Sequence, residues 1–503
     1  MTTGAVTTGR ADTIIRNGWV IDGSNSPRYR ADVAVTDGRI SAVGDLAAWS
    51  ADTQLDAAGR IVSPGFIDVH THDDCALVNT PAMTPKLSQG VTTVVVGNCG
   101  ASAAPFTLAP GGWPPDPLDL LGDRGFDFPR FADYIAWLGS HPPAINAAPL
   151  VGHTTLRHRH VSDLGGAARE DEIQAMERDM AQSMADGAIG LSTGLDYKAA
   201  LGSSTEEVVR LARVAAGHGG IFTCHHRAYF AGIEEALEEA FDIGHRGGLP
   251  MVVSHHQCSG RDNFGKAAPT LAQIERARRR QTIGLDVYPY AASSKTLDPN
   301  RCQPGVKVLI TRCVQHPEMV GKEISQVAAE WDCATNVQAA ERLVPANAVY
   351  FQLDEDDVRT IVGYPSSMIG SDGLPADDMP HPRLWGTFPR VFARYVREEA
   401  MFPTEMAVFK MTGLSARQFG FADRGFIGVG MAADIVVFDE ATIDEQGTWE
   451  KPAVPAVGID LVMVNGQAAW RQGQDTGARA GQVLRRDASV TPYPATPLYE
   501  TAA

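Results

Sequence analysis

The middle of the chain, about residues 63–425, alternates short apolar runs with amphipathic stretches. Eight apolar runs have the length and composition of buried strands: Val62–Val69, Val91–Val96, Ile145–Val151, Ala188–Leu191, Gly220–Thr223, Pro250–Val253, Ile283–Val287 and Ser367–Ile369. Strands that alternate with helices are typical of a parallel sheet. Eight such units predict an α/β fold of the (β/α)8 barrel type.

Two helical patterns between these runs carry clear end signals. Ser204 followed three residues later by Glu207 is typical of a helix start, and the pattern stops at the His-Gly-Gly of residues 218–220. Apolar residues recur at helical spacing across Ile233–Ile243, and the glycine pair at 247–248 closes that segment. Both segments are therefore predicted to be helices of the barrel.

Both ends of the chain are rich in short strand patterns. Asn17-Gly18 and Asp37-Gly38 predict tight hairpin turns near the start, and Asn465-Gly466 follows a strand pattern near the end. We therefore expect residues 1–62 and 426–503 to form one small β-sandwich domain beside the barrel of residues 63–425. Residues 1–10 are predicted to be a polar lead-in and residues 480–503 a surface tail.

Two intervals are longer than the repeat of one strand and one helix. Residues 101–143 include a Pro-rich excursion, and residues 295–350 form a larger insertion with a helical pattern of its own. Insertions on the loop face of a barrel commonly act as lids or as walls that set specificity.

Composition narrows the classes of partner. The 503 residues include 43 Lys and Arg against 60 Asp and Glu, and this net charge of −17 argues against a nucleic-acid partner. No run of about 18 apolar residues predicts a membrane span. The seven cysteines are odd in number and scattered, so no disulfide framework is expected, and a reducing cytoplasm is the predicted compartment. Oligomeric state stays open.

Histidines follow the first predicted strand. Alternation along a strand places Asp68, His70 and His72 on one face, where two imidazoles can reach one cation. A His-x-His pair alone also occurs on many surfaces.

Cys99, after the second strand, has glycines on both sides of the Asn98-Cys99 pair. A lone cysteine is usually a small core residue, but an exposed turn at a strand end also suits a thiolate ligand.

Two further histidines follow the fifth and sixth strands. His225 and His255 lie one strand-helix unit apart, which is hard to assign to chance. With Cys99 they make three soft donors, the set that favours zinc and leaves one position open.

Asp372 follows the eighth strand. Its Asp-Gly dipeptide is often only a turn, but at this barrel position its carboxylate is the natural general base.

At these residues the chain resembles a known family. Pro64–His72 (PGFIDVHTH) resembles the opening signature of the amidohydrolase superfamily, and the finer resemblance is to the D-aminoacylases, or N-acyl-D-amino-acid deacylases. The stretches that carry it are Gln89–Cys99, Leu150–Arg157, Gly190–Gly194, Ser254–Gly260, Leu285–Ser294, Met368–Leu374 and His381–Arg390. The resemblance implies a TIM barrel beside a small β domain, with zinc at the barrel mouth.

The resemblance also implies roles for the metal-site residues. Cys99, His225 and His255 would hold one tight Zn²⁺, and Cys99 would stand where many relatives use a carboxylated lysine. His70, His72 and Asp372 would line a second, weaker metal position. Asp372 would take a proton from water and deliver it to the leaving amine.

Substrate contacts are likewise implied by the resemblance. They would come from Tyr197, Tyr288, Ser294 and Arg383, with Arg383 pairing the α-carboxylate, while His153 would support the site. One departure concerns Gln257, which stands where the family usually has a lysine that helps to bind that carboxylate. Because glutamine is neutral, one charge-assisted contact is lost.

Three functions remain open on these grounds. The leading prediction is a zinc-dependent amide hydrolase that removes the acyl group from an N-acyl-D-amino acid or a related small amide. An alternative keeps the site but acts on a cyclic amide, a ureide or another amide without a free α-carboxylate, as Gln257 suggests. A catalytically silent binding barrel is disfavoured by the intact set of Cys99, His225, His255 and Asp372.

Overall fold

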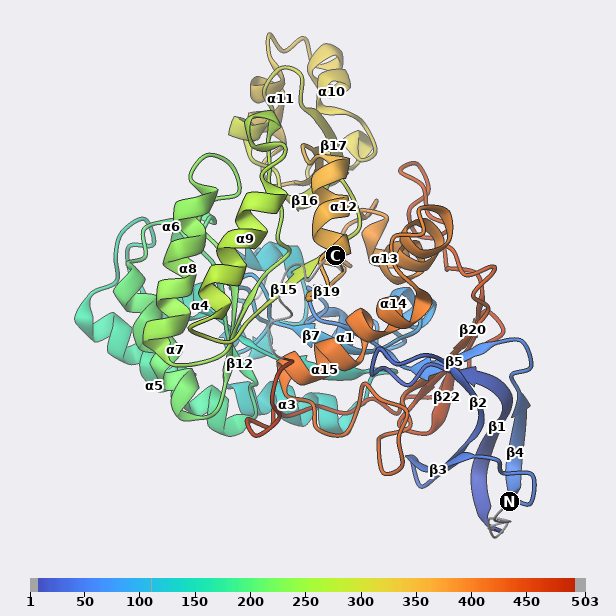
Figure 1. Cartoon of the computed structure of the whole chain (residues 1–503). Coiled ribbons are helices and arrows are strands. Elements are labelled where there is room, and N and C mark those ends of the chain that lie inside the picture. The colour runs from blue at the N-terminus through green and yellow to red at the C-terminus, as the bar shows by residue number, and fades with distance from the viewer. Residues whose placement is uncertain (1–7, 110, 494–503) are drawn as a thin grey trace, which may run out of the picture.

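The computed structural model describes residues 8–109 and 111–493. Helices surround a set of parallel strands, and antiparallel strands from both ends of the chain lie together on one side (Figure 1). Residues 1–7 of the predicted lead-in and residues 494–503 of the predicted tail lie outside the described residues. Within the described ranges, no helix is long and apolar enough to cross a membrane.

The two ends of the chain share one nine-stranded sheet. Its strands are β1 (Arg10–Val20), β2 (Tyr29–Thr36), β3 (Arg39–Gly44), β4 (Ser50–Asp56), β5 (Ile61–Pro64), β20 (Ile435–Phe438), β21 (Ile459–Val464), β22 (Gln467–Arg471) and β23 (Gln474–Asp475). β5 and β20 pair antiparallel, which joins the N-terminal strands to the C-terminal ones.

The turn predictions have mixed outcomes. Asp37-Gly38 joins β2 to β3 and Asn465-Gly466 joins β21 to β22, with φ values between 47° and 83°, as two-residue hairpins require. The prediction at Asn17-Gly18 is wrong. Asn17 has φ 64° but lies within the continuous strand β1, where the register against β2 shifts between Ile15 and Gly18. The dipeptide therefore forms a β-bulge and not a hairpin turn.

All eight predicted strands of the middle region are present, and they run parallel. β6 (Phe66–Asp68), β7 (Val91–Val96) and β10 (Asn146–Pro149) form one sheet; β11 (Val151–Gly152), β12 (Gly190–Gly194), β13 (Ile221–His225), β14 (Met251–Val253), β15 (Ile283–Val287) and β19 (Ser367–Ile369) form another. One residue separates β10 from β11. A parallel bridge between Thr71 and Gly373 links the segments that follow β6 and β19. The strands are mostly apolar, and every residue in them is buried, because both faces of each strand are covered.

One predicted strand, Val62–Val69, is divided between the two sheets. β5 belongs to the sheet of the chain ends and β6 to the parallel strands. Gly65 separates them, and a Cβ at this position would lie 2.1 Å from the hydroxyl of Thr92. A glycine is therefore required where the backbone passes from one sheet to the other.

Helices connect and cover the parallel strands (Figure 1). They are α1 (Ala76–Asn79), α2 (Thr84–Leu87), α4 (His153–His160), α5 (Glu170–Asp186), α6 (Lys198–Leu201), α7 (Thr205–Gly217), α8 (Ile233–Gly247), η2 (Arg261–Asn263), α9 (Ala267–Arg278), α12 (Glu355–Gly363), α13 (Arg383–Arg390), η5 (Val391–Glu398), α14 (Thr404–Met411) and α15 (Gly413–Phe419). The two helix predictions are confirmed. Ser204 accepts a hydrogen bond from the backbone of Glu207 at the start of α7, and Gly248 ends α8 with φ 74°.

The two longer intervals carry structure of their own. Between β7 and β10 lie the hairpin strands β8 (Phe106–Thr107) and β9 (Asp127–Phe128), η1 (Leu118–Leu121) and α3 (Phe131–Ser140). The larger insertion holds an antiparallel sheet of β16 (Ser293–Thr296), β17 (Lys307–Arg312) and β18 (Asn347–Phe351), with η3 (Pro299–Arg301), η4 (Pro317–Met319), α10 (Ile324–Glu330) and α11 (Asn336–Leu343). It projects at the top of Figure 1 and has a separate apolar cluster.

The segment predicted to begin a surface tail packs against the molecule. Val483 forms a parallel bridge with Ala147, and the backbone of Leu484 donates to the carbonyl of Ala147 at 2.8 Å. Leu484 is buried. The prediction is therefore wrong for this part of residues 480–503, because backbone pairing to Ala147 compensates for the weak apolar pattern.

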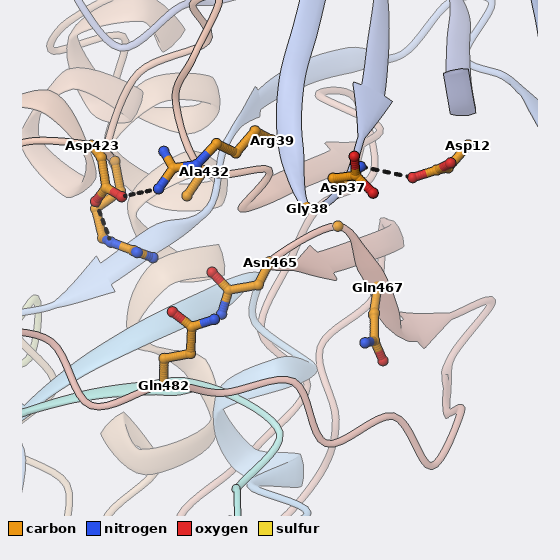
Figure 2. A pocket seen from close by; sticks show the side chains of 11 residues that line it. Asp12, Asp37, Gly38, Arg39, Asp423, Ala432, Asn465, Gln467 and Gln482 are labelled. Carbon is orange, nitrogen blue, oxygen red and sulfur yellow. Dashed lines mark hydrogen bonds and ion pairs between the residues drawn. The ribbon is translucent and has the colours of Figure 1, made fainter. Parts of the chain in front are cut away.

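A polar hollow lies where the two ends of the chain meet (Figure 2). In this hollow Asp423 pairs with Arg39 at 3.2 Å and with Arg424 at 3.3 Å, and the backbone N–H of Asp37 donates to Asp12 at 2.8 Å. Most of the residues predicted to carry chemistry line a different cavity, at the carboxyl ends of the parallel strands.

Candidate metal centre and active site

The six predicted metal-site residues all stand at the carboxyl ends of parallel strands. His70 and His72 follow β6, Cys99 follows β7, His225 ends β13, His255 follows β14 and Asp372 follows β19. All six are buried. Because these strand ends open on one edge, residues from five strands converge on one place.

Three of these residues have backbones in the left-handed region. The φ angles are 53° at Cys99, 33° at His255 and 49° at Asp372. Non-glycine residues seldom adopt this conformation, which costs about 1–3 kcal/mol and persists where the surroundings impose it. The chain therefore turns sharply at each strand end and directs these side chains toward one another.

Cys99, His225 and His255 form one group of potential ligands. The sulfur of Cys99 lies 3.3 Å from Nε2 of His255, which lies 3.0 Å from Nδ1 of His225. One donor atom from each residue lies within 4.8 Å of the others. Three electron-rich atoms thus face one another at distances that a shared cation would stabilise.

A second group contains His70, His72, Asp372 and the same Cys99. Nε2 of His70 lies 3.2 Å from the Cys99 sulfur, and Nε2 of His72 lies 3.1 Å from Oδ1 of Asp372. Cys99 is thus common to both groups. The sequence predicted that His70, His72 and Asp372 lie together, but it placed Cys99 only with His225 and His255.

The charges in this cluster favour ionised donors. Burial alone would raise the pKa of the Cys99 thiol, but His70, His255 and His225 hold that pKa well below its usual value. Burial would also raise the pKa of Asp372, yet the Arg383 guanidinium and the nearby histidines hold it well below its usual range. The surrounding charges therefore favour the thiolate form of Cys99 and the carboxylate form of Asp372.

These donors fit zinc. A thiolate and two imidazoles in a buried set of three match the soft ligands and low coordination number of catalytic zinc sites. The second group offers two imidazoles, a carboxylate and the shared thiolate. The cluster can therefore hold one cation on Cys99, His225 and His255, and a second one beside it.

Asp286 orients two of the histidines, and the sequence reasoning missed it. Its carboxylate lies 3.3 Å from Nδ1 of His70 and accepts the backbone N–H of His255 at 2.8 Å. An acidic residue within the apolar strand β15 is the signal that could have identified it, because a buried carboxylate requires partners.

Asp68 does not join the metal groups, although alternation predicted that it shares a face with His70. The regular strand β6 ends at Asp68. Its carboxylate accepts from Lys86 and from the backbone of Ser371, both at 2.8 Å. Asp68 and Lys86 therefore tie the end of β6 to the segment that carries Asp372.

A cavity opens beside the metal groups. Its lining includes the predicted residues His72, Tyr197, His225, His255, Gln257, Tyr288, Ser294 and Asp372, and the unpredicted Leu120, Asp196, Tyr229, Ser293, Lys295 and Arg301. Lys295 lies on β16 and Arg301 on η3 of the larger insertion. No sequence pattern placed these two cations beside β13.

Arg383 is buried next to the cavity at the start of α13. Its Nη2 lies 2.9 Å from Oδ2 of Asp372 and donates to the carbonyl of Ser294 at 3.2 Å. The guanidinium lies 4.5 Å above the ring of Tyr288. Among the described residues, Nε and Nη1 of Arg383 have no hydrogen-bond partner, so two nitrogens with three N–H donors stay unpaired.

Gln257 and His153 have different surroundings. Gln257 lines the cavity, and its Oε1 accepts a hydrogen bond from the hydroxyl of Tyr288. His153 begins α4, where its Nε2 lies 2.8 Å from Glu207. Glu207 also pairs with Arg157. His153 thus belongs to a buried ion cluster between α4 and α7 and does not line the cavity.

Comparisons with known proteins agree with this geometry. The model of the amidohydrolase family matches residues 54–280 and 324–469. D-aminoacylase of Alcaligenes xylosoxydans xylosoxydans is 48% identical over 95% of this chain and 98% of its own. A solved D-aminoacylase with a binuclear metal centre is 49% identical, with a TM-score of 0.92 over 95% of this chain and all of that one.

A second solved relative holds ligands in its site. N-acyl-D-glutamate deacylase from Bordetella bronchiseptica, complexed with zinc and a phosphonate mimic of the tetrahedral intermediate, is 46% identical. Its TM-score is 0.91 over 95% of this chain and all of that one. On the strength of the matched family model and these full-length similarities, the chain belongs to the amidohydrolase family, in the group of the D-aminoacylases.

Proposed function

We propose that this protein hydrolyses the amide bond of N-acyl-D-amino acids with the aid of zinc. The observation that carries the proposal is the buried set of Cys99, His225 and His255 beside a cavity that His225, His255 and Asp372 line. The D-aminoacylase and the N-acyl-D-glutamate deacylase described above share nearly half of their residues with this chain over their full length.

We also propose the finer architecture. The eight parallel strands, with β10 and β11 counted as one, close into a barrel over residues 63–425; the Thr71–Gly373 bridge supports closure. The described parts of the two chain ends, residues 8–62 and 426–493, form a small β domain, which the sheet shared by β5 and β20 supports. The metal groups then lie at the mouth of the barrel, where such enzymes have their active sites.

The residues divide between two metal positions. Cys99, His225 and His255 would hold the tight ion, and His70, His72 and Asp372 the weaker one. When bound, zinc polarises a carbonyl and lowers the pKa of water toward neutrality. In the solved D-aminoacylase one metal activates the enzyme and a second metal attenuates it, which supports this unequal division.

Asp372 is the proposed proton carrier. It is ionised, and Oδ1 lies among the histidines at the edge of the cavity while Arg383 neutralises Oδ2. As a carboxylate it accepts the proton of the attacking water and passes it to the leaving nitrogen. Because Asp372 serves both proton transfers, the leaving nitrogen departs as a neutral amine and not as an anion.

Substrate binding falls to the surrounding side chains. The free Nε and Nη1 of Arg383 can take the α-carboxylate, and the Tyr288 ring holds the guanidinium flat. Tyr197 and Ser294 line the cavity for the acyl and side-chain portions. His153 pairs with Glu207 away from the cavity, so we assign it no substrate contact.

The test is a panel of N-acetyl-D-amino acids with the matching L isomers, with released amine as the readout. The zinc-loaded enzyme is expected to release amine from D isomers and not from L isomers. Release from neither series, with zinc bound, would contradict the proposed substrate class.

Gln257 supports a second candidate substrate, an amide whose α-carboxylate is masked or absent. Its amide carries no charge, and its oxygen is occupied by Tyr288. A hydrogen bond between charged groups contributes about 1.5–3 kcal/mol against about 1 for neutral groups, so a free carboxylate binds roughly tenfold more weakly here than beside lysine.

Matched pairs distinguish the two candidates. kcat/KM of wild type and Gln257→Lys is compared on N-acyl-D-amino acids and on their methyl esters or amides. The second candidate requires wild type to prefer the masked member and Gln257→Lys to shift toward the free acid. Efficient hydrolysis of free acids by wild type, unchanged in Gln257→Lys, leaves the first candidate.

We further propose a reducing cytoplasm as the compartment and a small amide as the partner. All seven cysteines are free thiols, and six of them are buried, which suits a reducing environment.

A further inference from the structure

Asp196 stands between the metal group and the larger insertion. It follows β12, and its side chain is 9% exposed. Its Oδ1 lies 2.7 Å from Nε2 of His225. Both atoms are buried, and among the described residues neither has a hydrogen-bond partner, so the ion-pair contact is the interaction that joins them. Asp196 and His225 therefore face each other across a distance at which an N–H and a carboxylate oxygen interact.

The other carboxylate oxygen of Asp196 is held by the insertion. Oδ2 lies 3.0 Å from Nζ of Lys295 and accepts from Nη2 of Arg301 at 3.0 Å. The Lys295 ammonium also lies 4.6 Å from the centre of the Tyr197 ring. With two cations on one oxygen and an imidazole on the other, the carboxylate cannot rotate without breaking an ion pair.

This arrangement determines which nitrogen of His225 carries the proton. A neutral imidazole has one N–H, and a carboxylate can only accept. Nε2 facing Asp196 therefore holds the hydrogen, and the lone pair lies on Nδ1. Nδ1 points to Nε2 of His255, 3.0 Å away, inside the group that also contains Cys99.

We propose that Asp196 is a positioning residue for the metal centre. It holds His225 in the tautomer and orientation in which Nδ1 is a ligand, and Lys295 and Arg301 of the insertion hold Asp196 in turn. The inference rests on the proposed metal site but not on the proposed substrate. It links the insertion that walls the cavity directly to a ligand of the tight metal.

The test measures zinc binding with no substrate present. The full chain is stripped of metal, and the zinc dissociation constant is measured by competition with a chromogenic chelator. Asp196→Asn keeps the shape and removes the charge, and Asp196→Ala removes both. Loss of a carboxylate that orients a ligating histidine typically weakens metal binding about 10–100-fold, which is the expected effect.

Asp179→Asn is the matched control. The Asp179 carboxylate lies 2.7 Å from Nε2 of His160, the same pairing at the same distance, on α5 and outside both metal groups. Zinc affinity is expected to be unchanged in this variant. A cobalt(II)-substituted sample of each protein gives a second readout, since the visible bands report ligand geometry and are expected to change only in the Asp196 variants.

The outcomes are distinct from those of the substrate panel. Weaker zinc binding in either Asp196 variant, with thermal unfolding of the metal-free protein unchanged, supports the inference even if no tested amide is cleaved. Wild-type zinc affinity and cobalt spectra in both variants would overturn it. If Asp196→Ala does not fold, the isosteric Asp196→Asn carries the test.

A double variant tests the role of the insertion. Lys295→Met with Arg301→Met leaves the contact to His225 but frees Oδ2 of Asp196. Its zinc affinity is expected to lie between those of wild type and Asp196→Asn. If the double variant binds zinc as tightly as wild type, Asp196 needs no support from the insertion. That result would overturn the proposed role of Lys295 and Arg301.

Discussion

Cys99 is the residue on which both metal groups depend, because its sulfur is a member of each. Cys99→Ala leaves His225 and His255 as the remaining donors of the tight group, too few for stable tetrahedral binding. We expect this variant to lose bound zinc and activity together, as measured by metal analysis and amine release.

Cys333→Ala is the control for that variant, because Cys333 is partly exposed in the insertion and outside both groups. It should keep zinc and turnover. Full zinc occupancy in Cys99→Ala would contradict the assignment of the sulfur as a ligand.

Asp372 gives the second prediction at this scale. Asp372→Asn should keep the tight zinc, because Asp372 is not a member of that group, and should lower kcat about 10²–10⁴-fold as proton transfer is lost. Since Arg383 then lacks its anionic partner in a buried setting, the unfolding temperature is measured alongside kcat.

Asp378→Asn, at an exposed neighbouring carboxylate, should change neither quantity. A near-normal kcat in Asp372→Asn would assign the proton transfer to another residue.

At the scale of elements, Glu207 fastens α7 to α4. Its carboxylate, fully buried, lies 2.6 Å from Arg157 and 2.8 Å from His153. Glu207→Gln leaves the Arg157 cation without its anion. Breaking a buried pair on one side typically costs about 3–5 kcal/mol, so the free energy of unfolding at pH 7 should fall by an amount of that order. Urea unfolding measures it.

The same pair makes a prediction about pH. Burial would raise the pKa of Glu207, but His153 and Arg157 outweigh burial and lower it to about 2 from the model-peptide value of 4.5. A lowered carboxyl pKa stabilises the fold above the unfolded-state value, and the stabilisation is lost as pH falls toward the folded-state value. The advantage of wild type over Glu207→Gln should therefore be constant from pH 8 to 5 and shrink below about pH 4.5. An advantage that shrinks above pH 5 would contradict this origin.

At the scale of the whole molecule, the metal should stabilise the fold. Nε2 of His255 lies 3.3 Å from the Cys99 sulfur and 3.0 Å from Nδ1 of His225, and without a cation these donor atoms repel or must share protons. A ligand at 100 times its dissociation constant adds about 2.7 kcal/mol to the free energy of unfolding. Removal of zinc with a chelator should lower the unfolding temperature, and one equivalent of zinc should restore it.

Magnesium, a cation that prefers oxygen donors, is the control and should not restore the unfolding temperature. Equal unfolding temperatures with and without zinc would mean that the folded protein does not bind zinc more tightly than the unfolded chain, which would contradict the metal site.

Local patterns of this sequence predict its elements well where an element is decided by neighbouring residues. The apolar runs of β7, β15 and β19, the cap at Ser204 and the glycine after α8 lie where the sequence puts them. Asn17-Gly18 shows the limit. An Asn-Gly pair can form either a hairpin turn or a β-bulge. Here it forms a bulge, because β1 pairs with β2 on both sides of the dipeptide.

The residues of the site also differ in whether the sequence could predict them. Strand ends spaced one strand-helix unit apart were enough to predict that Cys99, His225, His255 and Asp372 converge, because parallel strands bring their carboxyl ends to one edge. Asp196, Lys295 and Arg301 could not be predicted, since their contacts join a loop after β12 to a separate insertion. Arg383 was predicted as a substrate contact, but only the fold shows that one of its nitrogens already pairs with Asp372.

The sequence by itself thus determined the alternation of strands and helices, the ligand types and their order along the chain, because these follow from local periodicity and residue chemistry. Only the tertiary structure decided how the two chain ends pair through β5 and β20, where the segment after residue 480 packs, and which charges meet at His225. Those contacts join residues far apart in sequence, and their free energy comes from burial and ion pairing that no single segment contains.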